Sequence, residues 1–366
     1  MTFLLLPYKM VNCSHPIGWL PASIAIAAFV LGMCISGFFG SWLIQRYRRN
    51  RVFVVSTIGL GLATLAFSLF DDKDFIIEYD TEMYVLQGLC FVCGVFFGNA
   101  KRVLSCTLLI DKTESCHRTN ANHVAICMAR IAIALAPIIA ITFRKEFGDL
   151  LTYITGAIFA ITSAIIVICV RFPFRAPDDG IKLISIDRFF LPQGWNTAIV
   201  IMLSTIVIGI IMATHMSIEF CIALSTGFLI ASLIMHHKKA TEWRYTSAVG
   251  NAIAIASAIL ITMYKNGIGL YIAAFWISFG ITLCLSEQLH KLLKHSNHCQ
   301  RSTAESTYFL ASDSGLLLGI AIGWQATIDT TYVPNAELAT IVILAVAIII
   351  CSINAMAKEK EKDFNA

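Results

Sequence analysis

Two charged side chains stand inside apolar runs, where a charge is costly. Arg130 lies in the stretch 116–140 and Asp313 in the stretch 299–323. An ionisable group at mid-membrane costs about 2.5–3.5 kcal/mol on insertion scales, so it persists where it has a partner or faces a water-filled cavity. The functional interpretation is a pair of groups that bind a substrate or couple a proton. The alternatives are a fixed structural ion pair, or an Arg130 side chain that extends to one membrane face.

The two stretches share an order of features, which indicates an internal repeat. Arg118 in the first aligns with Arg301 in the second, and in each a polar helix start and then the buried charge follow. A ladder of small residues, one helical turn apart, closes each copy: Ala132, Ala136 and Ala140 in the first, and Gly315, Gly319 and Gly323 in the second. Small residues let neighbouring helices approach closely. A repeat of this length predicts two copies of a many-helix unit.

The composition is that of an integral membrane protein. Of the 366 residues, 57% are hydrophobic and only 14% are charged, whereas soluble domains carry roughly 25% charged residues. Apolar runs long enough to cross a bilayer recur along the whole chain. The basic residues sit in short loops between these runs rather than on one face, which excludes a nucleic-acid-binding surface.

These runs predict an all-α integral membrane protein with about 11 full transmembrane helices and a partial first one. A span needs about 20 residues, so the short apolar burst in 1–10 is interpreted as the tail of a truncated first helix. The full spans are expected at about 20–44, 52–70, 83–110, 123–143, 149–170, 196–214, 217–235, 246–263, 267–288, 303–325 and 337–356. The longest connection, 173–195, separates two bundles, 1–172 and 196–366, and its FFLP end is expected at the membrane interface.

The Lys and Arg residues are distributed unequally between the two sides of the predicted bundle. Loops after the even-numbered spans, together with the C-terminal tail, hold most of the 27, and loops after the odd-numbered spans hold few. The positive-inside rule therefore predicts that the even-numbered side and the C-terminus lie in the cytoplasm.

Further polar side chains in the spans are candidates for a transport site. The fourth span contains Asn99, Lys101 and Arg102. Because Lys101 and Arg102 are adjacent, they point about 100° apart on a helix, and at most one of them faces a cavity squarely. Together with Arg130 they set three basic groups in the first half against Asp313 in the second, which favours a substrate with negative charge.

Three other features have weaker functional interpretations. Glu219, near the outer end of its span, is either a gate residue or an interfacial one. The residues before the eleventh span could hold a metal ion, but a cationic cytoplasmic loop is favoured there; they are His290, His295, His298 and Cys299. Most of the 12 cysteines fall inside apolar runs, where buried cysteine acts as a small hydrophobe. We therefore expect no metal and no cofactor.

Four short segments carry a family resemblance. Residues 40–51 read GSWLIQRYRRNR, 84–88 read YVLQG and 132–140 read AIALAPIIA, while Asp111 is followed by Arg118 in a loop. In that order they resemble the 2–3 loop, the span 4 motif, the antiporter motif of span 5 and the 4–5 loop of a bacterial member of the major facilitator superfamily. The resemblance extends over the whole chain.

Each motif departs from the family pattern in places. The residues that match the 2–3 loop motif are Gly40, Arg46, Arg48, Arg49 and Arg51. Gln45 or its neighbour stands where the family has aspartate, and Asn50 where it has glycine. Gln87 matches the span 4 motif, but Tyr84 replaces its arginine. In the span 5 motif Pro137 is kept and the glycines have become alanines.

The resemblance implies a secondary active transporter that works by alternating access, with two six-helix halves around a site lined by spans 1, 4, 7 and 10. It implies a monomer in the bacterial inner membrane, which meets a small-molecule substrate and the lipid bilayer. The span 5 proline motif favours an exporter. Because Tyr84 replaces the family arginine, either Asp313 takes over the coupling of protons or no proton coupling exists. A partial first span implies that the native start lies upstream or that this form is inactive.

Two classes other than a transporter stay open. A membrane-embedded transferase acting on lipid-linked sugars needs catalytic groups in sizeable outward loops, and the outward loops expected here are short. A non-transporting sensor, or a partner of another membrane protein, is favoured only if the truncated start is genuine. The balance of these arguments predicts a protein that is not an enzyme.

Overall fold

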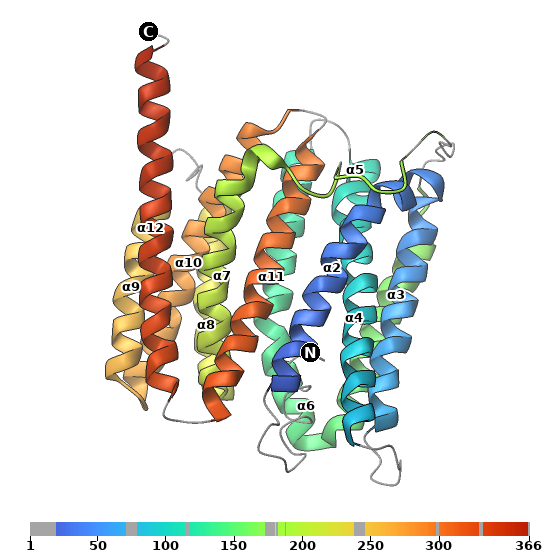
Figure 1. Cartoon of the computed structure of the whole chain (residues 1–366), viewed down its shortest axis with the longest axis horizontal. Coiled ribbons are helices and arrows are strands. Elements are labelled where there is room, and N and C mark those ends of the chain that lie inside the picture. The colour runs from blue at the N-terminus through green and yellow to red at the C-terminus, as the bar shows by residue number, and fades with distance from the viewer. Residues whose placement is uncertain are drawn as a thin grey trace. The chain divides into compact units, whose positions relative to one another are not determined.

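The described part of the chain is helical throughout its regular elements (Figure 1). The computed structural model describes residues 20–70, 79–113, 118–172, 180, 182–186, 188–237, 246–297, 300–328 and 332–364. The truncated first span expected at 1–10 lies outside them. The chain forms two compact units. Unit 1 comprises Met1–Ile126, Ala136–Leu191 and His298–Leu310, and unit 2 comprises Cys127–Leu135, Pro192–Asn297 and Ala311–Ala366. The division at 173–195 stays a prediction.

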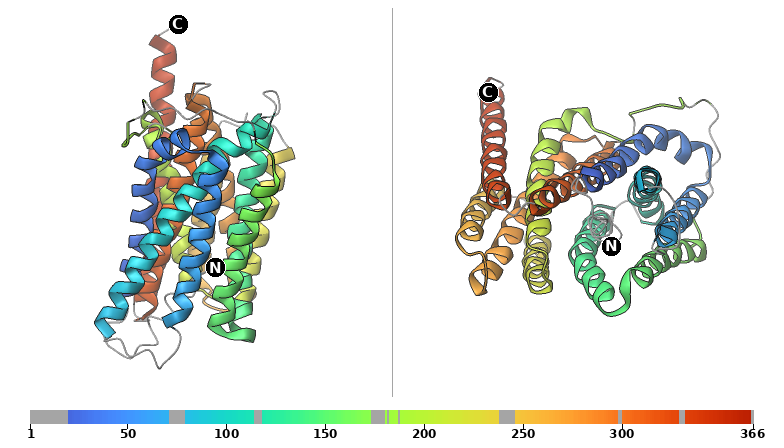
Figure 2. Two further views of the ribbon diagram at one scale, coloured as in Figure 1. Left: turned by 90° about the vertical axis from the view of Figure 1, so that its right-hand side faces the viewer. Right: turned by 60° about the horizontal axis from the view of Figure 1, so that its bottom comes forward.

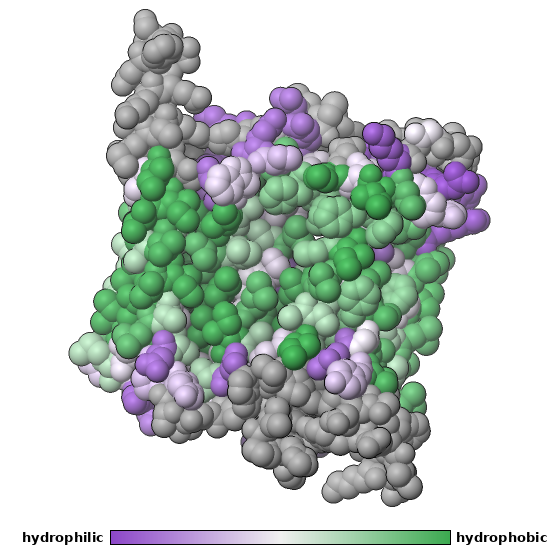
Figure 3. Space-filling model, viewed as in Figure 1, coloured by the Kyte–Doolittle hydropathy of each residue, from purple (hydrophilic) through white to green (hydrophobic). Residues whose placement is uncertain are grey.

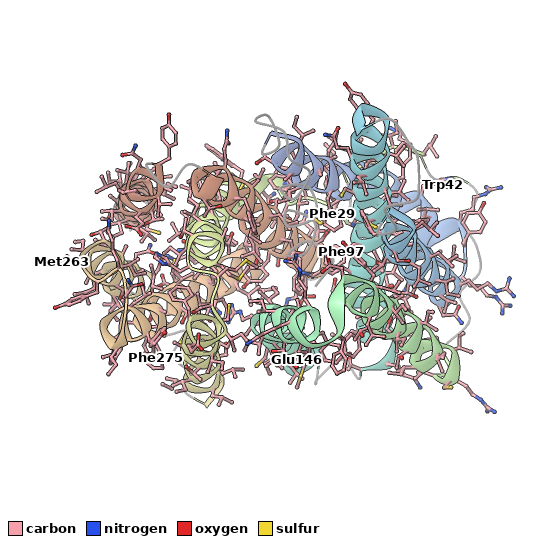
Figure 4. The ribbon with its side chains drawn as sticks, turned by 90° about the horizontal axis from the view of Figure 1, so that it is seen from below. Phe29, Trp42, Phe97, Glu146, Met263 and Phe275 are labelled. Atoms are coloured by element: carbon pink, nitrogen blue, oxygen red, sulfur yellow. The ribbon has the colours of Figure 1, made fainter. Side chains whose placement is uncertain are left out.

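In unit 1, helices α2 and α3 pack along α4 (Figures 1 and 2). Their bounds are Leu20–Arg46 for α2, Arg49–Ala66 for α3 and Tyr79–Val103 for α4. Glycine allows the α2 and α4 backbones to approach closely, because a Cβ built on Gly94 would lie 2.1 Å from the carbonyl oxygen of Phe29. The rings of Phe29 and Phe97 meet beside this contact, with centroids 5.6 Å apart (Figure 4). The apolar and small residues of these helices thus form one tightly packed layer.

Helix α4 does not end cleanly at Val103. It passes through a π-helical turn, Leu104–Leu108, into the short helix α5, Leu109–Lys112. A π-helical turn is wider than an α-helical one and is common at functional sites. Here it lies between the Lys101–Arg102 pair of α4 and the short helix α5, which contains Asp111.

Helix α6, Arg118–Cys169, contains both of the spans expected at 123–143 and 149–170. Gly148 interrupts it with φ 82° and ψ 179°, a conformation that glycine adopts without strain, and Figure 1 shows the helix turning back there. The described residues hold 10 candidate membrane spans, so the prediction of about 11 is wrong by this count. The difference lies in Val124–Cys169, which is counted as one span although it has 46 residues. One span across a hydrocarbon core of about 30 Å needs only about 20 residues, so this segment is long enough for two.

In unit 2, α10 packs against α7, α8 and α9, while α12 packs against α7 and α9. The bounds are Trp195–Thr214 for α7, Ile218–His237 for α8, Thr246–Met263 for α9, Ile268–His295 for α10, Arg301–Ile328 for α11 and Val333–Phe364 for α12. The glycine ladder of α11 lies against α7. A Cβ on Gly319 would lie 2.1 Å from the Ile206 carbonyl oxygen, and one on Gly315 would lie 2.4 Å from that of Met202.

The surface of the helices is arranged for a bilayer. Apolar side chains cover their middle, and hydrophilic side chains gather toward their two ends (Figure 3). Large apolar side chains such as Leu62, Ile166 and Val342 are exposed, as side chains that face lipid must be. The protein is therefore an integral membrane protein.

Candidate functional site

The adjacent residues Lys101 and Arg102 at the end of α4 have different surroundings in unit 1. Arg102 is only 6% exposed, and its Nη1 donates a hydrogen bond of 2.8 Å to the carbonyl oxygen of Ser36 on α2. Its guanidinium group lies 5.2 Å from the ring centroid of Phe189, within the range of a cation–π interaction. A Cβ on Gly40 would lie 2.2 Å from the same Nη1, so glycine leaves the space that Arg102 fills. These contacts favour a structural role for Arg102.

The segment that precedes α7 packs onto unit 1 beside Arg102. The Ser185 amide donates to the Phe38 carbonyl oxygen at 3.0 Å, and the Leu191 amide donates to Thr307 Oγ1 at 2.8 Å. The rings of Phe38 and Phe189 lie 5.1 Å apart. Phe189 and Leu191 are buried, and the expected position of this segment at the membrane interface stays a prediction. The apolar end of this segment is therefore a packing element of unit 1.

Lys101 extends toward two aromatic rings instead. Its Nζ lies 4.4 Å from the ring centroid of Phe309 on α11 and 5.5 Å from that of Phe97 on α4. The lysine is half-buried, and Asn99, two residues earlier, is buried. An ammonium group is attracted to the electron-rich face of an aromatic ring at such distances. The two adjacent cations thus differ, because Lys101 lies against aromatic rings and Arg102 is bonded to a backbone carbonyl oxygen.

Arg49 and Asp111, which the sequence assigns to two different loop motifs, form an ion pair in unit 1. Nη1 of Arg49 contacts the two carboxylate oxygens of Asp111 at 2.7 and 2.6 Å. Both side chains are partly buried, so water screens the pair less than it would screen an exposed one. The pair joins the start of α3 to α5, just beyond the π-helical turn.

The other residues of the predicted loop and packing motifs have varied surroundings. Helix α6 begins at Arg118 and α11 begins at Arg301, the two arginines that the repeat aligns. The exposed members of the predicted set are Arg46, Arg48, Arg51, Arg301, Ala132 and Glu219. Gln87 and Ala136 are half-buried, and Pro137 is buried inside α6.

Arg130 belongs to the part of α6 that is counted in unit 2. It is 8% exposed, and its Nη1 donates a 2.9 Å hydrogen bond to Ser286 Oγ on α10. Ser286 in turn donates to the carbonyl oxygen of Thr282 at 2.8 Å. Near Pro137, whose ring removes a helical hydrogen bond, Ser225 donates to the Ala134 carbonyl oxygen at 2.7 Å. These polar contacts tie the Arg130 segment to α8 and α10.

Asp313 is buried in the middle of α11. Its exposed fraction is 7%, and its neighbours Ser312 and Ser314 are buried as well. Gly315 and Gly319, the first two residues of the ladder that follows, hold this part of α11 close to α7. Asp313 thus sits at a closely packed helix contact. Its correspondence to Arg130 through the repeat stays a prediction.

A polar network that the sequence did not suggest connects α9 and α10. The Glu287 carboxylate accepts a hydrogen bond from the Ser247 backbone amide, in the first turn of α9, and pairs with Lys291 Nζ at 2.5 Å. A negative charge at a helix N-terminus is stabilised by the free amides and the helix dipole. Gln288 Nε2 donates to Ser247 Oγ at 2.8 Å. The buried Glu287 carboxylate therefore contacts both a backbone amide of α9 and the ammonium group of Lys291.

A second paired carboxyl group joins α12 to the end of α7. Glu337 is buried, and its Oε1 lies 3.0 Å from Nε2 of His215. The His215 ring lies 5.4 Å from the ring of Phe220. A histidine ring can hydrogen-bond a carboxylate in its neutral or its charged form. This contact serves the packing of α7 and α12 in either case.

Glu305, which the sequence analysis did not single out, is the most completely buried of the described carboxyl groups. It is 1% exposed, and its Oε1 has no hydrogen-bond partner among the described residues. It lies in the first part of α11, within the candidate span Arg301–Thr327. An acidic residue inside an expected span is the signal that could have identified Glu305. Its polar neighbours made this stretch resemble the polar start of a helix.

The side chains suited to metal binding are scattered. Within the described ranges, no three His, Cys, Asp or Glu side chains gather in a way that could hold a metal ion. Of the histidine cluster considered in the sequence, His298 and Cys299 lie outside those ranges. The polar groups that the described residues place in the membrane-spanning helices are buried cations and buried carboxyl groups, with aromatic rings beside some of them.

Three comparisons with known proteins bear on the family of this chain. No curated protein sequence matches the chain. Among solved structures, 199 chains match. One of these is the fucose:proton symporter FucP of E. coli, with a TM-score of 0.62 over 96% of this chain and 93% of that one, at 12% sequence identity. That likeness concerns the fold alone. The Major Facilitator Superfamily model matches residues 13–323. The chain therefore belongs to the major facilitator superfamily, whose members are transporters and not enzymes.

Proposed function

We propose that this protein moves a small, negatively charged molecule across the membrane by alternating access, with Lys101 and Arg130 as contacts for the substrate and Asp313 as a group that couples protons. The observation that carries the proposal is the burial of Arg130 and Asp313 inside membrane-spanning helices of a family member. Such charges are costly in a bilayer and persist where they serve a pathway. Lys101 adds a second cation, which lies beside two aromatic rings.

The remaining features of the proposal come from the sequence motifs. The Ala132–Ala140 segment with Pro137 supports export rather than import. The charge asymmetry of the loops supports a cytoplasmic C-terminus in a bacterial inner membrane. Arg49 and Asp111 support a gating role for the loops, because breaking and re-forming their ion pair would release and hold α5 against α3.

The test is transport by the purified protein in liposomes. A panel of small organic anions is loaded inside or outside, with and without a pH gradient, and their movement is followed with radiolabelled compounds. Arg130→Ala and Asp313→Asn should each lower the rate about tenfold or more, because a hydrogen bond to a charged group contributes about 1.5–3 kcal/mol.

Matched controls come from another part of α6. Arg144 and Asp149 form a partly exposed ion pair at 2.7 Å, so Arg144→Ala and Asp149→Asn remove the same groups outside the proposed site and should leave the rate near that of the wild type. Transport by Arg130→Ala and Asp313→Asn at the wild-type rate would overturn the site. If the wild type moves nothing across a broad panel, a non-transporting role as a membrane sensor or partner is favoured instead.

A further inference from the structure

Glu305 is enclosed on all sides of its helix. Every residue from Thr303 to Phe309 is buried, so no face of this part of α11 opens to water through which the carboxyl group could be hydrated. On the side of Thr307, the Leu191 amide of the segment before α7 donates a hydrogen bond. A short side chain such as glutamate has little reach beyond its own helical turn. Its carboxyl group therefore stays inside the packed protein.

Among the described residues, most charged groups on the elements around this part of α11 are cations. Phe309 lies one helical turn beyond Glu305 on the same face of α11. The Nζ atom of Lys101 lies 4.4 Å from the centroid of the Phe309 ring. The other described charged groups on the end of α4, on the segment 182–191 and on α11 itself are Arg102, Lys182, Arg188, Arg301 and Asp313. Arg102 is engaged with Ser36. The Oε1 atom of Glu305 accepts a hydrogen bond from none of them within the described ranges.

A carboxylate charge is costly at such a position, because Oε1 is buried without a hydrogen-bond partner among the described residues. Burying an ionised carboxylate without a counter-charge or hydrogen bonds is strongly unfavourable, whereas the protonated acid is neutral and can be buried at far lower cost. The arrangement around Glu305 is therefore one that accommodates a bound proton. The carboxylate form needs a different arrangement, in which water or a cation such as Lys101 reaches it.

We propose that Glu305 is a proton-binding site, which holds its proton in the arrangement described here and releases it when this part of α11 is opened to water or to Lys101. The binding step is simple: one proton from water adds to the carboxylate and gives the neutral acid. Because Lys101 also stands at the proposed substrate site, release of the proton and binding of an anion would compete for the same ammonium group. The part that this proton plays in transport rests on the proposed function; the protonation itself does not.

Infrared spectroscopy of the protein in lipid vesicles tests the protonation without any substrate. At neutral pH the wild type should show the C=O stretching band of a carboxylic acid in apolar surroundings, and the band should disappear as the pH is raised. Glu305→Gln should lose the part of this band that comes from Glu305. Glu337→Gln is the matched control, because Glu337 is an equally buried carboxyl group with a histidine partner, and it should keep the band. A band unchanged by Glu305→Gln would overturn the proposal.

A second measurement needs no variant and therefore does not depend on the folding of one. Dicyclohexylcarbodiimide is an apolar reagent that modifies protonated carboxyl groups in membrane-embedded protein. In the wild type, mass spectrometry should find Glu305 modified, with less modification as the pH rises, and Glu287 largely unmodified because its charge is paired. Modification of Glu287 with Glu305 untouched at mildly acidic pH would overturn the proposal.

The transport assay then tests the role of the proton. Glu305→Gln, which mimics the protonated form permanently, should still exchange substrate for substrate but lose accumulation driven by a pH gradient, and Glu305→Asp should restore part of it. Accumulation by Glu305→Gln at the wild-type level would overturn the role of Glu305 while leaving the transporter function intact. A wild type that transports nothing would contradict the proposed function, and the infrared result would still decide whether Glu305 binds a proton.

Discussion

Among the described residues, the buried glutamates of unit 2 contact basic side chains, whereas Glu305 in unit 1 has no such contact. In unit 2, Glu287 pairs with Lys291 and with the amide at the start of α9, and Glu337 pairs with His215. In unit 1, Glu305 is more buried than either, yet its Oε1 has no hydrogen-bond partner among the described residues. The three side chains have the same chemistry and similar burial, so the difference lies in their partners alone.

The difference separates two uses of a carboxyl group inside a membrane protein. A paired carboxylate holds helices in register, because removing it leaves its partner unsatisfied. An unpaired one contributes nothing of this kind and adds a cost, so a sequence that keeps it must gain something else. Glu287 and Glu337 fit the first use. Glu305 fits the second, and proton binding is the gain that its surroundings allow.

The same contrast occurs within unit 1 between two neighbouring cations. Arg102 is fixed by the Ser36 carbonyl oxygen and the Phe189 ring, on two other elements. Lys101 lies over the rings of Phe97 and Phe309. Adjacency in the sequence predicts only that their directions differ. Their surroundings differ, because Arg102 joins α4 to two other elements and Lys101 lies against aromatic rings.

The largest effect on stability is expected from the most completely paired carboxyl group. Glu287→Gln removes the charge that both Lys291 and the Ser247 amide contact. Since a hydrogen bond to a charged group contributes about 1.5–3 kcal/mol, the free energy of unfolding should fall by about that amount, toward the lower end because Lys291 is partly exposed. The melting temperature, followed by tryptophan fluorescence in detergent micelles, should drop clearly.

An exposed glutamate provides the control for this first variant. Glu146 on α6 is exposed and labelled in Figure 4, and Glu146→Gln should change stability by less than about 0.5 kcal/mol. If Glu287→Gln melts at the same temperature as Glu146→Gln, the paired carboxylate Glu287 does not stabilise the helices of unit 2. The contrast between paired and unpaired carboxyl groups would then be contradicted.

Much of the helical layout could be predicted from apolar runs alone. The span expected at about 246–263 matches α9, and that at 196–214 begins one residue after α7 does. Hydropathy marks where the chain crosses a bilayer, and it is silent where a helix continues beyond it. For that reason the sequence missed the polar extension of α10 to His295 and the continuity of α6 up to the Gly148 turn.

The candidate site was less predictable, because contacts depend on which helices meet. Motif order brought Arg49 and Asp111 into consideration, and the structure joins them. Nothing in the sequence pointed to the Glu287–Lys291 pair, since the expected span ended near it and both residues looked like the edge of a loop. Glu305 was hidden in the same way: polar residues near the start of a span suggest an interface, and only burial by other elements distinguishes a core position.

An intermediate effect is expected at the second paired carboxyl group. Glu337→Gln keeps a hydrogen-bonding oxygen and the shape of the side chain but loses the negative charge that faces His215. The free energy of unfolding should fall by about 1 kcal/mol, the contribution of an ordinary hydrogen bond. A double-mutant cycle with His215→Asn measures the coupling directly. Strictly additive effects of the two changes would show that the contact contributes nothing.

The smallest effect, and the one that decides the comparison, is expected at Glu305. Glu305→Gln removes no ion pair, and it replaces a group that must be protonated to be buried with one that is always neutral. Stability near neutral pH should stay within about 0.5 kcal/mol of the wild type or rise. At higher pH, where the wild-type carboxyl group must give up its proton or keep it at a cost, the variant should become the more stable of the two. The measurement is the melting temperature of both proteins across a pH series. A loss at Glu305→Gln as large as that at Glu287→Gln would mean that Glu305 has a partner in solution, and the unpaired carboxyl group of unit 1 would then be a structural one like those of unit 2.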